Sequence, residues 1–94
     1  MPEQPTATLH FTVTDDDTAL AVGSGSLPVL GTPRLIAWCE AATCAVALPA
    51  ADRATATSVG TRIEFDHVAA SRVGAEITVT AVLAESAGRR LRYD

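Results

Sequence analysis

Hydrophobic and polar positions alternate near both ends of the chain, whereas its middle carries a nearly continuous apolar run. Residues 8–13 (TLHFTV) switch between polar and apolar side chains, as a half-buried β-strand does. Residues 76–83 alternate in the same way, and residues 89–94 repeat the pattern in a shorter form. A further strand is predicted over residues 55–67, with a turn at residues 86–88 before the last strand. The pattern therefore predicts strands on both sides of one central segment.

The central segment has the pattern of a helix that is buried on most sides. Apolar residues between positions 35 and 48 surround the axis instead of forming one stripe. Thr32 and Pro33 have the form of an N-cap followed by a proline in the first turn, and Pro49 ends the segment. The glycine- and proline-rich residues 23–33 predict a loop before the helix.

Fold class follows from this order of elements and from the length of the chain. With 94 residues, the chain corresponds to a single domain, residues 1–94. A helix with strands before and after it predicts the α+β class, with an antiparallel sheet wrapped around one long central helix. Because so short a chain leaves much of its surface exposed, we expect a homodimer or a higher homo-oligomer.

Composition narrows the range of partners and cofactors. The chain has 11 acidic residues against 7 basic ones, a net charge of −4, which argues against nucleic acid as a partner. Its two cysteines, Cys39 and Cys44, lie on different faces of the predicted helix and are expected to be reduced core residues. No metal or redox cofactor is implied. No membrane-length apolar run or secretory signal is present, so we expect a cytoplasmic location.

Three polar residues carry candidate chemistry, and each also has a purely structural explanation. Glu40 interrupts the apolar helix, so its carboxylate is paired, protonated or functional, or else faces solvent or a subunit contact. His67 follows Asp66 at the end of a predicted strand, where it is either structural or able to titrate near neutral pH and orient a water molecule. Thr32 either caps the helix or stands where backbone N–H groups converge on an anion.

Three stretches of the chain carry a resemblance to a known family. These stretches are GTPRLIAWCEAA (31–42), SVGTRIEFDHVAASRVG (58–74) and TVTAVLAESAGRRL (78–91). Together they resemble the hotdog-fold thioesterases, and most closely the fluoroacetyl-CoA thioesterase group, over about residues 20–92. The resemblance implies a hotdog fold and an acyl-CoA substrate, with coenzyme A as part of that substrate and no separate cofactor.

The same resemblance implies a set of site residues. Thr32, Glu40 and His67 fall on the catalytic positions, and the backbone of Gly60 falls where the family helps to hold the acyl carbonyl. Glu40 would act as general base or nucleophile, and His67 would assist proton transfer to the departing thiol. Thr32 would hydrogen-bond the carboxylate or the carbonyl. Because eight helical residues rise about 12 Å, we expect Thr32 to lie in a loop that folds back, with the helix starting nearer Leu35.

The basic residues near the end of the chain have two interpretations. Alternation along the last strand puts Arg90 and Arg92 on one face, where their guanidinium groups could bind the phosphates of coenzyme A. They could equally be edge-strand charges that keep the sheet soluble.

Two departures from the family pattern modify the expected function. The loop SGSLPVLG (24–31) has no aromatic residue where the fluoroacetyl-specific enzyme has an aromatic gate, so we expect another acyl group, small or aromatic. Hotdog sheets continue beyond the GRRL segment, so a C-terminal truncation relative to the family is expected. The alternatives to a thioesterase are a non-catalytic acyl-CoA binding or sensing module and an inactive dimerising fragment.

Overall fold

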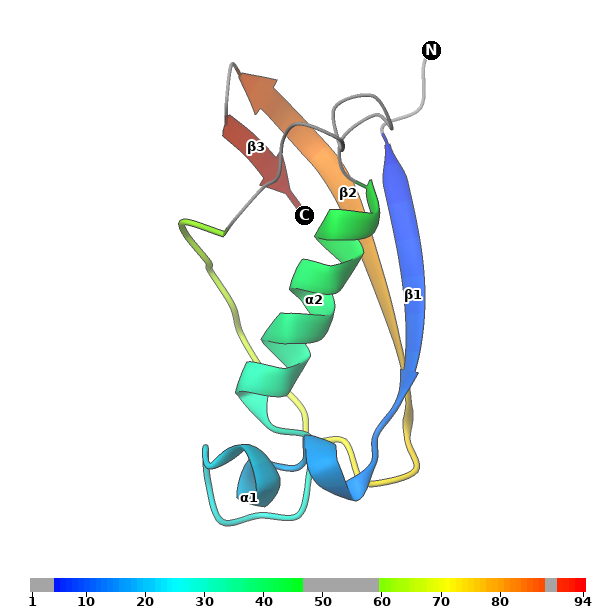
Figure 1. The fold of residues 1–94 in the computed structure, drawn as a ribbon, viewed down its shortest axis with the longest axis vertical. Helices are drawn as coiled ribbons and strands as arrows, with labels where there is room; N and C mark the ends of the chain where they lie inside the picture. The colour runs from blue at the N-terminus through cyan, green and yellow to red at the C-terminus, as the bar shows by residue number, and fades with distance from the viewer. Residues whose placement is uncertain (1–4, 47–59, 88–89) are drawn as a thin grey trace.

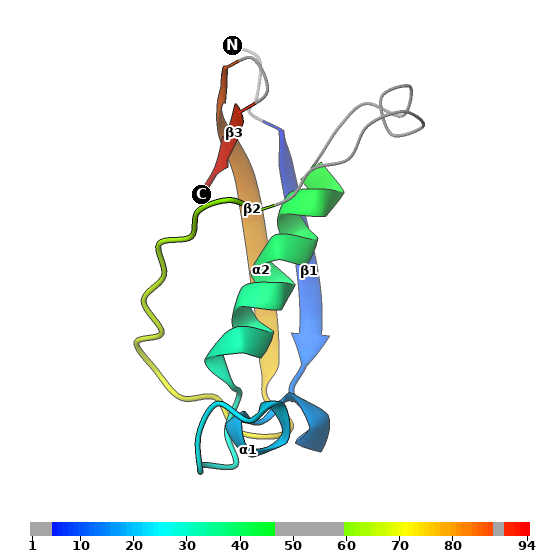
Figure 2. The same ribbon diagram turned by 60° about the vertical axis from the view of Figure 1, so that its left-hand side comes forward.

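The computed structural model describes residues 5–46, 60–87 and 90–94, and within these ranges a helix packs on a three-stranded sheet. The strand order is β1-β2-β3, and both neighbouring pairs are antiparallel. Helix α2 lies across one face of this sheet, and α1 lies near the start of α2 (Figures 1 and 2). The α+β class is therefore confirmed. The elements in chain order are β1 (Thr6–Thr12), the 3₁₀ helix η1 (Asp15–Asp17), α1 (Ala19–Val22), α2 (Thr32–Val46), β2 (Glu76–Ala87) and β3 (Arg90–Tyr93).

Alternating side chains of β1 and β2 face the helix and form the core. The register places Leu9 opposite Val79 and Phe11 opposite Ile77. The ring of Phe11 stacks on Trp38 of α2, with ring centroids 4.5 Å apart and planes 4° from parallel. Such an aromatic contact adds about 0.5–1.5 kcal/mol to the free energy of burial. The buried hydrophobic residues of the core are Val13, Leu30, Trp38, Ala42, Val79 and Ala81.

Helix α2 begins at Thr32, so the expected start nearer Leu35 is wrong. The backbone N–H of Leu35 donates to the carbonyl of Gly31 at 3.0 Å, which closes the first turn. Gly31 lies so close to α1 that a Cβ atom added to it would stand 2.7 Å from Cγ2 of Val22. Its N–H also donates to the carbonyl of Asp17 at 2.9 Å. A residue without a side chain lets the helix begin directly against α1.

The expectation that α2 is buried on most sides is also wrong for the single chain. Within the helix only Trp38 and Ala42 are buried, while Glu40 and Cys44 are exposed and Cys39 is half-buried. Burial raises the pKa of the Cys39 thiol. The expectation of two core cysteines therefore fails for Cys44. One sheet covers one face of a helix, and the small apolar residues on the other face remain accessible.

The segment of residues 60–70 runs alongside α2 without regular secondary structure (Figures 1 and 2). The predicted strand at residues 55–67 is therefore wrong for residues 60–67, and residues 55–59 lie outside the described ranges. No backbone hydrogen bond joins residues 60–70 to another described residue, and a strand requires such a ladder. An alternating sequence alone does not create a strand when no neighbouring strand is present.

Several strand boundaries differ from the expected ones by a few residues. β1 covers most of the predicted residues 8–13, and β2 begins at Glu76 as predicted but continues to Ala87. The predicted turn at residues 86–88 is thus wrong at its first two positions, which pair with β3. The predicted helix end at Pro49 lies outside the described ranges. Among the described helices, none is long and apolar enough to cross a bilayer.

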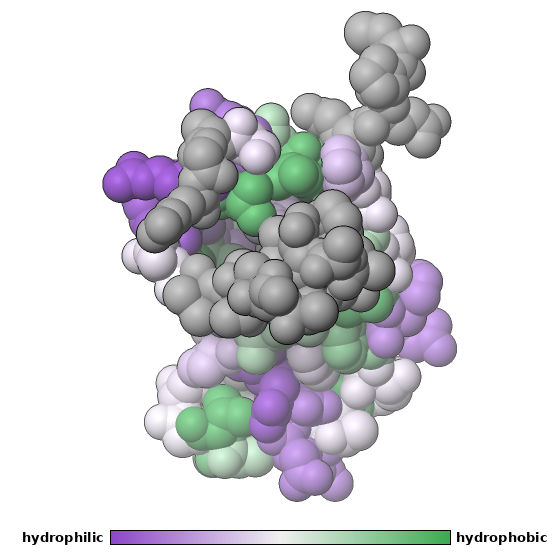
Figure 3. Space-filling view, turned by 45° about the horizontal axis from the view of Figure 1, so that its top comes forward, coloured by the Kyte–Doolittle hydropathy of each residue, from purple (hydrophilic) through white to green (hydrophobic). Residues whose placement is uncertain are grey.

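The surface of the described residues carries exposed hydrophobic side chains. Figure 3 shows one face on which hydrophobic side chains, in green, reach the surface between hydrophilic ones in purple. The most exposed is Val68, at 90%, in the segment that runs beside α2; Ile63 of the same segment is 52% exposed. This segment therefore presents apolar groups to the solvent in the single chain.

Candidate active site

Thr32 and His67 form the first contact of the candidate site. The hydroxyl Oγ1 of Thr32 and Nδ1 of His67 are 2.7 Å apart, within hydrogen-bond distance. His67 is half-buried, and its ring stands edge-on to that of Phe65, with centroids 6.3 Å apart. Thr32 is held by the first turn of α2. The structure therefore gives the Thr32 hydroxyl the imidazole as its partner, whereas the sequence suggested the Glu40 carboxylate or the substrate carbonyl.

Glu40 and Gly60 form the second contact. A Cβ atom added to Gly60 would stand 3.0 Å from Oε2 of Glu40, so the carboxylate lies directly against the glycine backbone. Glu40 itself is exposed on the side of α2 that the sheet does not cover. A side chain at position 60 would require the end of the Glu40 side chain to shift by a few tenths of an ångström, and glycine allows the approach without such a shift.

The two contacts lie along the same stretch of helix and the same crossing segment. Thr32 and Glu40 are separated by about 12 Å of helical rise, whereas residues 60–67 would span about 23 Å if fully extended. The segment runs antiparallel to the helix, because Gly60 meets Glu40 and His67 meets Thr32. Since its contour exceeds the distance between its contacts, it bows away from α2, as Figure 2 shows. All four residues implied by the resemblance thus lie along one side of α2.

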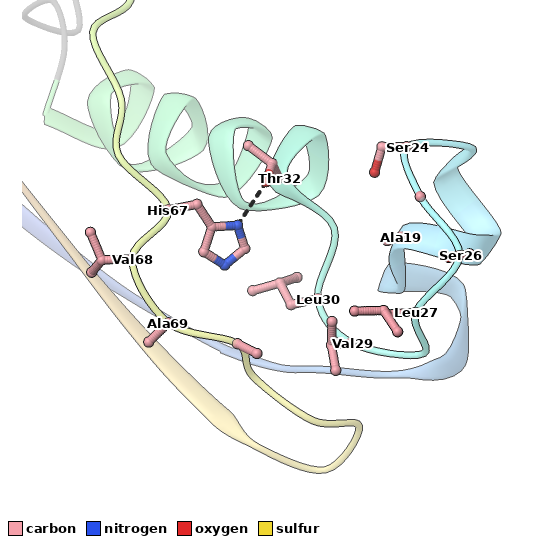
Figure 4. A pocket seen from close by; sticks show the side chains of 12 residues that line it. Ala19, Ser24, Ser26, Leu27, Val29, Leu30, Thr32, His67, Val68 and Ala69 are labelled. Carbon is pink, nitrogen blue, oxygen red and sulfur yellow. Dashed lines mark hydrogen bonds between the residues drawn. The ribbon is translucent and has the colours of Figure 1, made fainter.

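A cavity of about 390 Å³ opens beside the Thr32–His67 pair. Its walls come from the loop of residues 24–30, which precedes α2, and from residues 67–70 (Figure 4). Leu27 and Leu30 extend from the loop toward the imidazole (Figure 4). The pattern of the sequence had indicated a loop at residues 24–30, and the resemblance had implied that this loop lacks an aromatic gate.

Arg90 and Arg92 lie on one exposed face of β3, as the alternation predicted. Arg92 is already paired, with Nε 3.3 Å from Glu85 and an Nη atom 3.4 Å from Asp94. Within the described residues, no hydrogen bond or ion pair links either arginine to Thr32, Glu40 or His67. Both are accessible to an anion, but the geometry does not join them to the other candidates.

Metal coordination has no support in the described part of the chain. No group of three or more His, Cys, Asp and Glu side chains is placed there to hold a metal ion. The chemistry of the site is that of one carboxylate, one imidazole and one hydroxyl, which are groups for proton transfer and hydrogen bonding.

Solved structures identify the class of protein that this fold and site define. The chain is similar to the fluoroacetyl-CoA thioesterase FlK, at 27% identity and a TM-score of 0.78, over 99% of this chain and 73% of FlK. It is also similar to a phenylalanine-to-alanine variant of FlK in complex with fluoroacetate and CoA, at 26% identity and a TM-score of 0.77, over 99% and 78% of the two chains. A threonine-to-alanine variant in complex with fluoroacetate matches at 25% identity and a TM-score of 0.77, over 99% and 74%. The fold is thus the hotdog fold of FlK-like thioesterases.

Family membership follows from the sequence as well. The model of the family described as fluoroacetyl-CoA-specific thioesterase (FlK) matches residues 13–94, and the chain belongs to this family. A search among curated proteins found no match. The resemblance that the three sequence stretches indicated is therefore confirmed.

Proposed function

We propose that this protein hydrolyses an acyl-CoA thioester, with Glu40, His67 and Thr32 as catalytic residues and Gly60 in the substrate site. The observation that carries the proposal is the pair of contacts along α2, in which Gly60 approaches the Glu40 carboxylate and His67 bonds to Thr32. Membership of a thioesterase family supports the same reaction.

The proposed reaction begins at the carboxylate. Glu40 is exposed and therefore accessible to water and to substrate. As general base it takes a proton from the attacking water while the oxygen adds to the thioester carbonyl; as nucleophile it attacks the carbonyl itself. A backbone N–H group, such as that of Gly60, would stabilise the negative charge that develops on the carbonyl oxygen.

The second half of the reaction needs a proton for the departing thiolate. In its protonated form His67 carries a proton on each ring nitrogen, so Nδ1–H donates to the Thr32 hydroxyl and the Nε2 proton remains for transfer. The C–S bond breaks, the sulfur of coenzyme A takes the Nε2 proton, which leaves a neutral imidazole, and the acyl group leaves as the carboxylic acid. The proton held by Glu40 returns through solvent to the imidazole. Thr32 therefore acts by orienting the ring of His67.

A homodimer belongs to the same proposal. Residues 60–70 present exposed Ile63 and Val68 and form no backbone hydrogen bond with other described residues. An extended segment with free backbone groups and apolar side chains suits pairing with a second copy. Sedimentation equilibrium should give a dimer, and a monomer at micromolar concentration would contradict this part. The expected cytoplasmic location and the role of Arg90 and Arg92 in binding coenzyme A phosphates stay predictions.

A non-catalytic acyl-CoA binding module is the second candidate. It is favoured by the separation of Glu40 from the Thr32–His67 pair, since the helical rise between Thr32 and Glu40 is about 12 Å. Both candidates predict binding of acyl-CoA. They differ in whether Glu40 and His67 are needed for turnover.

The deciding experiment measures release of coenzyme A from a panel of acyl-CoA esters. Glu40→Gln should lower kcat by about 10²–10⁴-fold, because removal of a general base has that effect. Glu76→Gln, an exposed glutamate of β2, is the matched control and should leave kcat unchanged. Acyl-CoA binding by Glu40→Gln and His67→Ala, measured by calorimetry, should persist. Binding without turnover in the unsubstituted protein would favour the binding module.

A further inference from the structure

The cavity beside the Thr32–His67 pair is lined by small residues, apolar side chains and a few uncharged polar groups. Small residues such as Ser24, Ser26 and Ala69 occupy much of its wall, and larger apolar side chains, Leu27 and Val68 among them, supply the rest. Leu27 is 63% exposed, so it contributes apolar surface to the opening in the single chain. Because the cavity adjoins the hydroxyl and the imidazole, a group bound there lies next to the proposed reaction centre.

Among the described residues, no charged side chain belongs to this lining, and His67 is its single titratable residue. An acyl group that ends in a carboxylate would lose part of its hydration on entering without gaining a cationic partner. The nearby Arg34 is engaged by Asp17 at 3.1 Å and is not part of the wall. The lining therefore favours an uncharged acyl group.

The volume of the cavity bears on the size of that group. At about 390 Å³ it lies in the range of sites that bind drug-sized molecules, so an acetyl or fluoroacetyl group would leave most of it empty. Each further methylene that enters an apolar site gains binding free energy from the area it removes from water. No bulky side chain of residues 24–26 (Ser-Gly-Ser) narrows the cavity.

We propose that this cavity is the acyl subsite, that it selects uncharged hydrocarbon acyl groups larger than acetyl, and that the small residues Ser26 and Ala69 on its two walls set the upper size limit. This inference rests on the proposed thioesterase function. It concerns the acyl group alone and assigns no new residue to the chemical step.

The first test is a substrate series on the full chain. We expect kcat/KM for butyryl-, hexanoyl- or benzoyl-CoA to exceed that for acetyl-CoA by about tenfold or more, because added methylenes in an apolar pocket raise kcat/KM by that order. Succinyl-CoA has a similar length but ends in a carboxylate, so its kcat/KM should be about tenfold or more below that of butyryl-CoA. A flat series, or acetyl-CoA as the best substrate, overturns the inference when turnover depends on Glu40.

The second test narrows the cavity from each wall. Ser26→Leu and Ala69→Leu should lower kcat/KM for hexanoyl-CoA by about tenfold and lower it for acetyl-CoA much less. Ser86→Leu makes the same change on an exposed serine of β2 outside the cavity and should leave the whole series unchanged. An unchanged circular dichroism spectrum establishes that the variants fold. Equal losses for both esters in both cavity variants overturn the inference and leave the proposed function standing.

Failure of the proposed function gives a different result. If no ester in the series is hydrolysed and Glu40→Gln changes nothing, the thioesterase assignment fails, and the acyl subsite that rests on it fails too.

Discussion

The two sides of helix α2 have different tasks. On the side that faces the sheet, Trp38 stacks on Phe11 and Ala42 is fully buried, and both belong to the hydrophobic core. On the side that faces residues 60–67, Thr32 bonds to His67 and the Glu40 carboxylate lies against Gly60. Positions 38 and 40 are only two residues apart, and 3.6 residues per turn place them on opposite sides.

This difference teaches how so small a chain can separate stability from chemistry. A carboxylate buried among apolar residues would cost several kcal/mol, but on the side away from the sheet it stays accessible to water. The core is then made by residues that have no part in the proposed chemistry, and we expect the candidate catalytic residues to contribute little to folding. Substitutions on the two sides should accordingly have separable effects.

The largest expected effect is a difference in stability between substitutions at positions 38 and 40, which lie on the two sides of α2. Trp38→Ala should lower the free energy of unfolding by about 3–5 kcal/mol, because it removes a buried aromatic ring. Glu40→Ala, at an exposed position, should change it by no more than about 0.5 kcal/mol. Urea denaturation followed by circular dichroism measures both values. Equal losses would contradict the division between the two sides.

A smaller effect is expected where α2 begins against α1. Gly31→Ala should lower the free energy of unfolding by about 1–3 kcal/mol, because the added methyl would stand 2.7 Å from the Val22 side chain. Gly25→Ala is the matched control, since its methyl would meet Ala19 at an ordinary 3.5 Å. Thermal denaturation of the two variants should show a lower Tm for Gly31→Ala. An equal Tm would mean that α1 and the helix start can move apart freely.

The two cysteines test the difference between the two sides of α2 through their reactivity, and this is the smallest of the expected effects. Cys39 packs against the core and Cys44 is exposed, so a thiol reagent should modify Cys44 first. Burial raises the pKa of Cys39, which lowers its thiolate fraction near neutral pH, and its reaction should therefore accelerate as the pH rises.

Cys44→Ser leaves Cys39 alone and Cys39→Ala leaves Cys44 alone, so mass spectrometry over time can follow each reaction separately. If Cys39 were modified faster than Cys44 at neutral pH, Cys39 could not lie against the core, and the assignment of the two sides of α2 would be contradicted.

The candidate site could be predicted from the sequence through the resemblance. Three sequence stretches led to the family, whose membership is confirmed, and the resemblance implied Thr32, Glu40, Gly60 and His67 as site residues. The contacts within the set were harder to predict. The bond between Thr32 and His67 depends on where residues 60–67 cross α2, and helical geometry alone indicated that Thr32 would leave the helix.

The position of the cavity could not be predicted from the sequence, for a different reason. Residues 24–30 and 67–70 form its walls only because Gly31 holds the loop against α1 and the bridge between Val29 and Arg72 joins the two segments. Serine, glycine and alanine in loops have many uses, so their spacing in the chain predicts no binding site.

The sequence by itself determined the local elements: three alternating strands, one long apolar helix, and one carboxylate within that helix. Periodicity encodes these features because each depends on near neighbours in the chain. Only the tertiary structure decided which side of α2 is buried, where the helix begins, and that residues 60–67 lie along α2 without forming a strand. Those outcomes depend on contacts between residues far apart in sequence, and the same local pattern is compatible with several of them.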